Sequence, residues 1–182
     1  MCSTTFMISL ENALRTASTA QYGALGEEAA SVFLENQMDA TLVSMGDAGM
    51  PRTGNLQDLD ITAVVDGEFI AFEVKTRYRS RRAGRLTRGG DLLRPRLSRT
   101  STGSRQGSQG YATARIGDIV DTGDGYEGVQ VQLIVIDLRL MMLQVFALND
   151  DGRILASVTP PVDCASEVQT GYKQIVGHRG HL

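Results

Sequence analysis

The chain has 182 residues, of which 42% are hydrophobic, and it carries a formal net charge of −3. This length and composition suit one globular domain that buries a core without disulfides or metals to staple it. The slight excess of acidic residues argues against a protein that coats nucleic acid indiscriminately.

The first residues do not resemble a targeting signal, because no basic segment is followed by a continuous apolar one and Glu11 and Arg15 interrupt what comes next. The longest apolar stretch, residues 133–146, contains charged side chains and is therefore unsuited to cross a membrane. Cys2 and Cys164 have neither metal-like nor redox-like spacing. We therefore expect a cytoplasmic protein with free thiols.

Two helices are expected before the first strand. Apolar residues at helical spacing predict one helix at 9–20, with Ser9 as its N-cap, and a second at about 25–38. On a helical wheel Glu27 falls between apolar side chains, whereas Glu28 falls on the polar side. Glu27 is therefore the better candidate for a carboxylate that faces a site. The alternative is that both acids are merely favoured by the helix dipole in the first turn.

A short strand is expected at 41–45, and the most informative stretch, 58–77, contains two β-type runs that flank Asp66-Gly67. This dipeptide favours a two-residue type I′ turn, because both central residues of that turn need a positive φ. A loop of this length pairs Val65 with Glu68 and fixes the register of the hairpin. The face predicted to be buried consists of Leu59, Ile61, Ala63, Val65, Ile70, Phe72 and Val74.

The other face of the same hairpin carries four charged groups. The register places Asp60 opposite Glu73 and Asp58 opposite Lys75, and Glu73 and Lys75 share a face because they are two residues apart. Two opposed carboxylates repel each other unless a cation lies between them or one of them is protonated. Such oxygen ligands, together with substrate phosphates, suit Mg²⁺. The alternative is an exposed face on which Asp58 and Lys75 form a surface ion pair worth about 0–1 kcal/mol.

These residues resemble the core of the PD-(D/E)xK nucleases, and most of all the small Holliday-junction-resolvase-like members. The likeness covers roughly residues 23–77 and rests on three pieces in order: Gly26-Glu27, Asp58-Leu59-Asp60-Ile61 and Glu73-Val74-Lys75-Thr76-Arg77. Leu59 stands where many members have a proline. The resemblance implies an α/β domain with a restriction-endonuclease-like core, in which helices flank a mixed central β-sheet.

The resemblance also implies an activity, the hydrolysis of DNA phosphodiester bonds. Asp60, Glu73 and the backbone carbonyl of Val74 would hold Mg²⁺, for which Mn²⁺ would substitute, and the metal would polarise the scissile phosphate. Lys75 would orient or deprotonate the attacking water, and Glu27 would contact the metal directly or through water. A structure-selective endonuclease that acts as a homodimer is the first expectation.

Two alternatives stay open. The same core could belong to another nuclease, such as an exonuclease, a restriction-type enzyme or a nuclease toxin. It could also belong to a non-catalytic DNA-binding or assembly protein that retains the fold. The sequence contains no glycine-rich phosphate loop, nucleophile elbow or Cys-x-x-Cys pair, which removes most nucleotide-binding, hydrolase and zinc functions.

Basic residues concentrate directly after the Lys75 strand. The chain has two lysines and 16 arginines, and eleven of the arginines lie from Arg77 to Arg115. Residues 77–110 are rich in Arg, Gly and Ser with few large apolar side chains, which predicts a mobile arm. Its arginines would hold DNA phosphates, unless the segment is only a solvated linker. The candidate DNA-binding residues are Arg77, Arg79, Arg81, Arg82, Arg85 and Arg88.

The remainder of the chain predicts a short helix at 111–120 and a meander that extends the sheet. The meander has strands at 129–138, 141–148 and about 154–158. Pro160-Pro161 ends the last strand. We therefore expect a single nuclease-like domain over 1–160, followed by a polar tail at 161–182.

Overall fold

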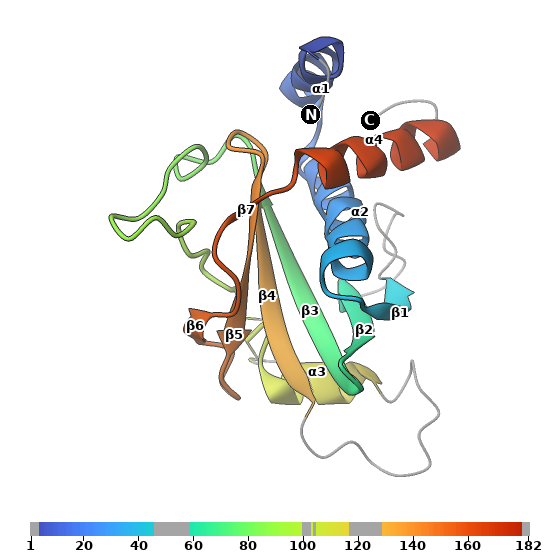
Figure 1. Ribbon diagram of the computed structural model, residues 1–182. Coiled ribbons are helices and arrows are strands. Elements are labelled where there is room, and N and C mark those ends of the chain that lie inside the picture. Colours follow the sequence, from blue (N-terminus) through green and yellow to red (C-terminus); the bar gives the residue numbers. More distant parts are fainter. Residues whose placement is uncertain (1–3, 46–58, 100–102, 104, 117–128, 180–182) are drawn as a thin grey trace.

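A computed structural model describes residues 4–45, 59–99, 103, 105–116 and 129–179. Within these residues the protein is α/β, with four helices and an open, mixed sheet of seven strands (Figure 1). The elements are α1 (Thr4–Thr16), α2 (Thr19–Gln37), β1 (Thr41–Met45), β2 (Ile61–Val65), β3 (Glu68–Arg77), α3 (Gln109–Ile116), β4 (Gln130–Asp137), β5 (Met142–Leu148), β6 (Ile154–Ser157), β7 (Val162–Asp163) and α4 (Ala165–Arg179).

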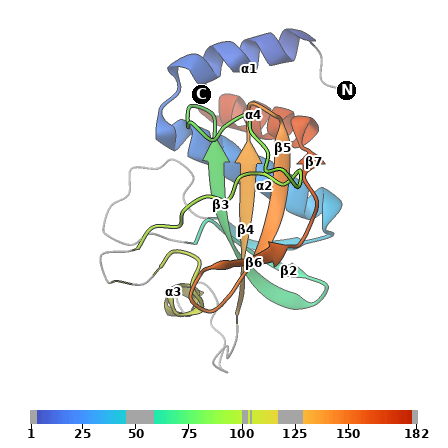
Figure 2. The ribbon, with the colours of Figure 1, turned by 90° about the vertical axis from the view of Figure 1, so that its left-hand side faces the viewer.

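The sheet has the strand order β1-β2-β3-β4-β5-β6, and β7 pairs with β5. Only β3 and β4 are parallel; the other pairs are antiparallel among the described strands. Helices α2 and α4 cover one face of the sheet, whereas α3 and the segment that follows β3 cover the other (Figures 1 and 2). None of the described helices combines the length and the apolar character that crossing a membrane would need.

Strands β2 and β3 form the hairpin that the sequence predicts. Val65 pairs with Glu68, and both residues of the Asp66-Gly67 loop have a positive φ, 51° and 82°, as a type I′ turn requires. The register then continues without a shift to Ile61 opposite Phe72. The predicted loop length and register are confirmed over these residues.

Alternate residues of the hairpin build the main core, where they pack with side chains of α1, α2 and α4. The apolar residues predicted for this face and found there are Ile61, Ala63, Val65, Ile70, Phe72 and Val74. Leu59 is the exception, because it packs with Ala71 and Tyr111 on the opposite face of the sheet. The chain bends at Asp60 and β2 begins only at Ile61, so the strand alternation does not extend back to Leu59.

The helix boundaries differ from the expected ones. Helix α1 begins at Thr4, so that Ser9 lies inside the helix and is not its N-cap. Helix α2 begins at Thr19, where Ser18 Oγ accepts from Gln21 N at 3.3 Å and Gln21 Oε1 accepts from Ser18 N at 2.7 Å. This reciprocal capping box satisfies two backbone donors and fixes the break between the two helices.

The arginine-rich segment after β3 lies against the sheet. Leu92 and Leu97 are buried in a cluster with side chains of β4 and β5. Gln144 on β5 accepts from Leu92 N at 2.8 Å and donates to Asp91 Oδ1 at 2.7 Å. This packing does not fit the expected mobile arm, because two leucines and one buried amide give the segment a defined place.

The expected polar tail contains a core helix. Val168 and Ile175 of α4 join the main core, and Gly171 faces α2. A Cβ at Gly171 would lie 3.0 Å from the Cβ of Glu28 and 3.1 Å from the nitrogen of Ala29. The glycine therefore lets the two helices approach closely, and residues 165–179 pack as part of the domain.

Cys164, just before α4, is a free and buried thiol. Burial, together with the nearby charges of Glu167 and Asp163, raises the pKa of this thiol above its ordinary value. Cys164 is therefore protonated and unreactive at neutral pH. Cys2 lies outside the described residues.

Candidate active site

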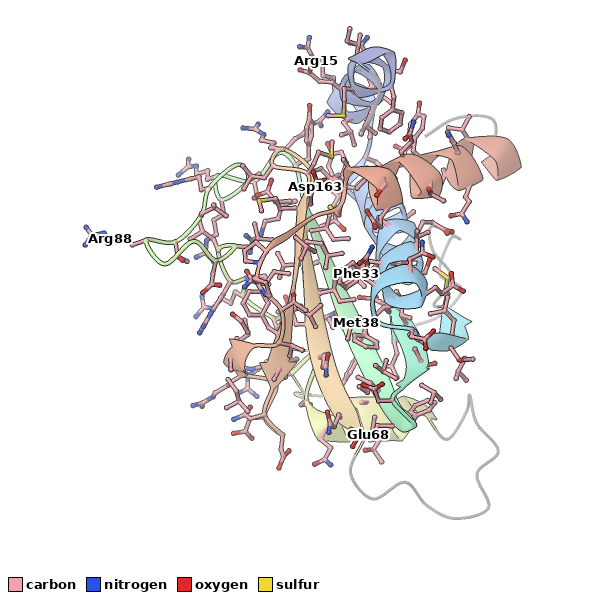
Figure 3. All side chains as sticks on the ribbon, in the orientation of Figure 1. Arg15, Phe33, Met38, Glu68, Arg88 and Asp163 are labelled. Carbon is pink, nitrogen blue, oxygen red and sulfur yellow. The ribbon has the colours of Figure 1, made fainter. Side chains whose placement is uncertain are left out.

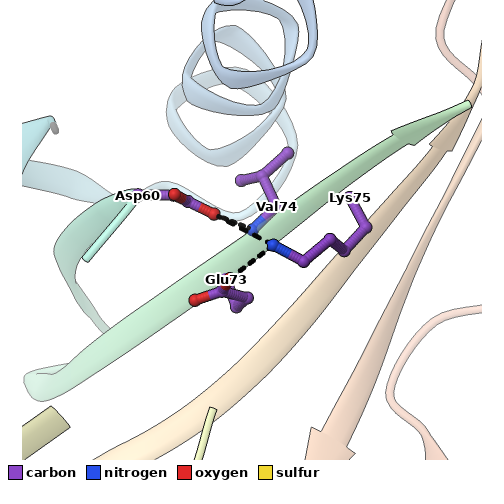
Figure 4. A network of polar contacts seen from close by, with 4 residues as sticks. All are labelled: Asp60, Glu73, Val74 and Lys75. Atoms are coloured by element: carbon purple, nitrogen blue, oxygen red, sulfur yellow. Dashed lines mark hydrogen bonds and ion pairs between the residues drawn. The ribbon is translucent and has the colours of Figure 1, made fainter. Parts of the chain in front are cut away.

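Three charged side chains converge beside β3, just before β2 begins (Figure 4). Alternation along β3 puts Glu73 and Lys75 on one face. Lys75 Nζ donates to Glu73 Oε1 at 2.5 Å and lies 4.0 Å from Asp60 Oδ2. One ammonium group thus lies within reach of two carboxylates, and the hairpin brings the three residues together.

Asp60 reaches this position by a different route from the expected one. The β2–β3 ladder ends at Ile61 and Phe72, so Asp60 is not a strand partner of Glu73. Instead, Asp60 Oδ2 accepts a hydrogen bond of 2.7 Å from the backbone nitrogen of Val74. The carboxylate accepts the hydrogen bond that a neighbouring strand would otherwise accept from Val74. This bond holds Asp60 beside β3.

Burial strengthens the electrostatic interactions among these three charged groups. Glu73 is 2% exposed, and the side chains of Asp60 and Lys75 are 12% and 29% exposed. Burial alone would lower the pKa of Lys75, but the charges of Glu73 and Asp60, the hydrogen bond to Glu73 and the charge of Glu27 together raise it above its ordinary value. Lys75 is therefore a cation at neutral pH and compensates the buried carboxylate of Glu73.

Helix α2 brings a third acid toward the site. The charge of Glu27 acts on Lys75, whereas the neighbouring Glu28 lies against α4. Gly26 sets how closely α2 approaches β3, since a Cβ there would lie 1.7 Å from Thr76 Oγ1. The glycine permits the contact and the next residue supplies the carboxylate, which gives the Gly26-Glu27 pair a physical explanation.

Replacing Gly26 with alanine should lower the free energy of unfolding by about 1–3 kcal/mol, the usual cost of overpacking a core. The reason is the clash with Thr76, which forces α2 away from β3. Chemical denaturation of the variant and of the natural protein measures the difference.

Gly23→Ala is the matched control in the same helix. A Cβ at Gly23 would meet only Glu27 Oε1, at 4.0 Å, so alanine should raise the free energy of unfolding by roughly 0.5–1 kcal/mol through its better helix propensity. Equal effects of the two substitutions would mean that α2 does not contact β3 at Gly26.

The donor set near Asp60 fits a hard divalent cation. The N–H and C=O of one strand residue leave the strand on the same side, so the Val74 carbonyl faces the side on which Asp60 lies. Two carboxylates and a carbonyl are ligands that Mg²⁺ accepts when water and substrate complete its shell. Among the described residues, no three His, Cys, Asp or Glu side chains are arranged so that they could hold a metal ion together, and Asp58 lies outside these residues.

Three of the six predicted DNA-binding arginines make contacts within the protein. Arg77 is only 7% exposed. Arg79 donates to the backbone carbonyl of Arg15, and its guanidinium carbon lies 5.7 Å from the centre of the Tyr22 ring. Arg82 donates to a backbone carbonyl of its own segment at 2.8 Å.

The other three arginines, Arg81, Arg85 and Arg88, are exposed. Figure 3 shows Arg88 at the far end of its loop, where it points away from the sheet. The six residues therefore do not form one uniform patch.

Asp137, on β4, is a buried acid that the sequence did not single out. It is fully buried, and its carboxylate accepts from the backbone nitrogens of Gly84 at 2.8 Å, Arg139 at 3.0 Å and Leu140 at 3.2 Å. It is the strand partner of Arg77. The signal in the sequence that could have identified Asp137 is its position as a charged residue within an otherwise apolar run.

The chain matches no protein-family model, no curated protein and no solved structure. The functional assignment therefore depends on the geometry of the Asp60, Glu73 and Lys75 site.

Proposed function

We propose that the protein is a metal-dependent DNA endonuclease with a restriction-endonuclease-like core, and that it hydrolyses phosphodiester bonds at Asp60, Glu73 and Lys75. The observation that carries the proposal is the convergence of two carboxylates on one lysine, with Lys75 Nζ 2.5 Å from Glu73 Oε1 and 4.0 Å from Asp60 Oδ2. A lysine that only neutralised Glu73 would not explain why Asp60 is held beside it by the Val74 nitrogen.

Each residue has a distinct role in this proposal. Asp60, Glu73 and the Val74 carbonyl hold Mg²⁺, which, when bound, polarises the scissile phosphate and stabilises the leaving oxygen. Lys75 is a donor beside the reacting phosphate and orients the attacking water. Glu27 lies at the helix side of the site and holds the Lys75 ammonium in position through its charge.

A cleavage assay tests the proposal. Labelled four-way junctions, flaps, linear duplexes and single strands are incubated with the protein and Mg²⁺ or Mn²⁺. We expect cleavage with either ion, strongest on branched DNA, and none in EDTA. Asp66→Asn is the control substitution, since it removes one carboxylate from the same hairpin while Asn-Gly keeps the type I′ turn. Absence of cleavage for every substrate and both ions would overturn the proposal.

A non-catalytic DNA-binding protein is the second candidate. The observation that favours it is the short ion pair between Lys75 and Glu73, in which the acid already has a cationic partner. Titration with Mg²⁺ separates the two candidates, because a scaffold should show no saturable binding that depends on Asp60. The salt dependence of DNA binding, by contrast, should be similar for a nuclease and for a non-catalytic DNA-binding protein.

The exposed arginines should govern that salt dependence. Changing Arg81, Arg85 and Arg88 to glutamine should weaken DNA binding for all sequences, and the slope of log K against log salt should fall by roughly 0.9 for each phosphate that is no longer neutralised. Fluorescence anisotropy at several salt concentrations measures both. Lys173→Gln on α4 is exposed on the other side of the sheet and should change neither value. An unchanged slope in the triple variant would mean that these arginines do not contact DNA phosphates.

A further inference from the structure

Arg77 combines a charged side chain with almost complete burial. It is the last residue of β3 and is 7% exposed. Strand alternation places it on the face that carries Glu73 and Lys75. Its Cα lies about 6.6 Å along the strand from that of Lys75, at roughly 3.3 Å per residue. Arg77 is therefore a direct neighbour of the candidate active site.

The guanidinium group of Arg77 has unused donors. Nη1 and Nη2 are both buried, and neither has a hydrogen-bond partner among the described residues. Arginine offers five N–H donors in a planar fork, and it is always charged. A buried cation that lacks acceptors is unfavourable, and an anion with several oxygens would relieve it.

Asp137 does not supply the missing acceptor. It is the strand partner of Arg77, but its carboxylate accepts three backbone hydrogen bonds and none from Nη1 or Nη2 of Arg77. Burial lowers the pKa of Arg77; the charge of Asp137 raises it and that of Arg82 lowers it, and the net direction is downward. The charge of Arg82 thus acts on Arg77, and the carboxylate of Asp137 is occupied by backbone donors.

We infer that Arg77, assisted by Arg82, forms an internal phosphate-binding site beside Glu73 and Lys75. The ligand class is an anion with several phosphoryl oxygens, which the guanidinium fork binds in a bidentate manner. That the ligand is a DNA phosphate, held next to the bond to be cut, rests on the proposed function. Arg77 then fixes the substrate relative to Lys75, whereas the exposed arginines supply only general electrostatic attraction.

The turn at residues 81–84 follows Arg77 closely in the chain and supplies Arg82. It is joined to Asp137 by the Gly84 hydrogen bond of 2.8 Å, and to the carbonyl of Arg94 by the Arg82 hydrogen bond of 2.8 Å. Nη1 and Nη2 of Arg77 are both buried, so a phosphate reaches them only when the groups that cover them shift. In this proposal Arg82 would exchange its bond to the Arg94 carbonyl for one to the phosphate.

Thermal unfolding without divalent metal tests the site apart from cleavage. Inorganic phosphate and a 5′-phosphorylated tetranucleotide are titrated at constant ionic strength against the natural protein, Arg77→Met and Arg82→Gln. We expect a saturable rise in Tm for the natural protein with both ligands. Arg77→Met should weaken binding about 10- to 100-fold, because it removes charge-assisted hydrogen bonds. Arg82→Gln should weaken it less, because the Arg82 side chain is exposed and donates to the Arg94 carbonyl when no phosphate is bound.

Arg153→Met removes an exposed arginine from another loop and should leave both titrations unchanged. Arg77→Met should also be at least as stable as the natural protein without ligand, since its unpartnered charge is gone. If inorganic phosphate binds in an Arg77-dependent manner but the tetranucleotide does not, the phosphate site stands and the DNA assignment fails. If neither ligand gives a saturable shift, or if Arg77→Met and Arg82→Gln respond like the natural protein, the inference is overturned even where DNA is cleaved.

Discussion

Lys75→Met should lower the free energy of unfolding by about 3 kcal/mol in metal-free buffer, because it leaves Glu73 buried without the ammonium that lies 2.5 Å from it. Loss of one partner from a buried ion pair costs about 3–5 kcal/mol, and the partial exposure of Lys75 places this pair at the lower end. Urea unfolding in EDTA measures the change.

Two further variants locate the cause of this loss. Lys173→Met, on the surface of α4, should change the free energy of unfolding by less than about 0.5 kcal/mol. The double variant Glu73→Gln and Lys75→Met should recover most of the stability, since neutral groups of similar size replace the buried pair. A loss below about 1 kcal/mol for Lys75→Met would mean that the pair behaves as a solvated one.

Asp60→Asn should abolish the stabilisation that Mg²⁺ gives and should reduce cleavage by roughly 100-fold or more. A metal ion contributes several kcal/mol of transition-state stabilisation, and each 1.36 kcal/mol changes the rate about tenfold. Asparagine keeps an oxygen that accepts from the Val74 nitrogen, so the fold should persist. Saturating Mg²⁺, at about 100 times its Kd, should stabilise the natural protein by about 2.7 kcal/mol.

Thermal unfolding with and without Mg²⁺, beside the cleavage assay, decides the role of the acids. Asp66→Asn should retain both the ion response and the activity. If the natural protein gains no stability from Mg²⁺, and if neither Asp60→Asn nor Lys75→Met alters any processing of DNA, the carboxylates are structural and the nuclease proposal should be dropped.

The sequence predicts the hairpin well because its determinants are local. The Asp66-Gly67 loop specifies a turn type, and the turn type fixes every pairing from Val65 to Ile61. The approach of Glu73 and Lys75 follows from the strand alternation alone. The bend at Asp60 does not follow, because it accompanies a hydrogen bond in which the Asp60 carboxylate, and not a strand neighbour, accepts from the Val74 nitrogen.

The features that the sequence misses depend on partners that are distant in the chain. Gln144 accepts a hydrogen bond from Leu92 N and so fixes Leu92 in place. The composition of a segment rich in Arg, Gly and Ser does not reveal this contact. The helix at 165–179 has few apolar residues, and its fit to α2 depends on the absence of a side chain at Gly171. Arg77 is buried where β3 pairs with β4. From the sequence, an arginine at the start of a polar segment is expected to be exposed.

The parallel pairing of β3 and β4 has a consequence for the order of folding. Its partners, such as Ile70 and Gln130, are far apart in the chain, whereas the β2–β3 and β4–β5 hairpins join neighbouring segments. Isolated hairpins form within about 1–10 μs, but distant strands must first overcome the entropy of closing a long loop. The rate-limiting step should therefore be the docking of two preformed hairpins. Asp60, Glu73 and Lys75 meet before that step, and Arg77 meets Asp137 only after it.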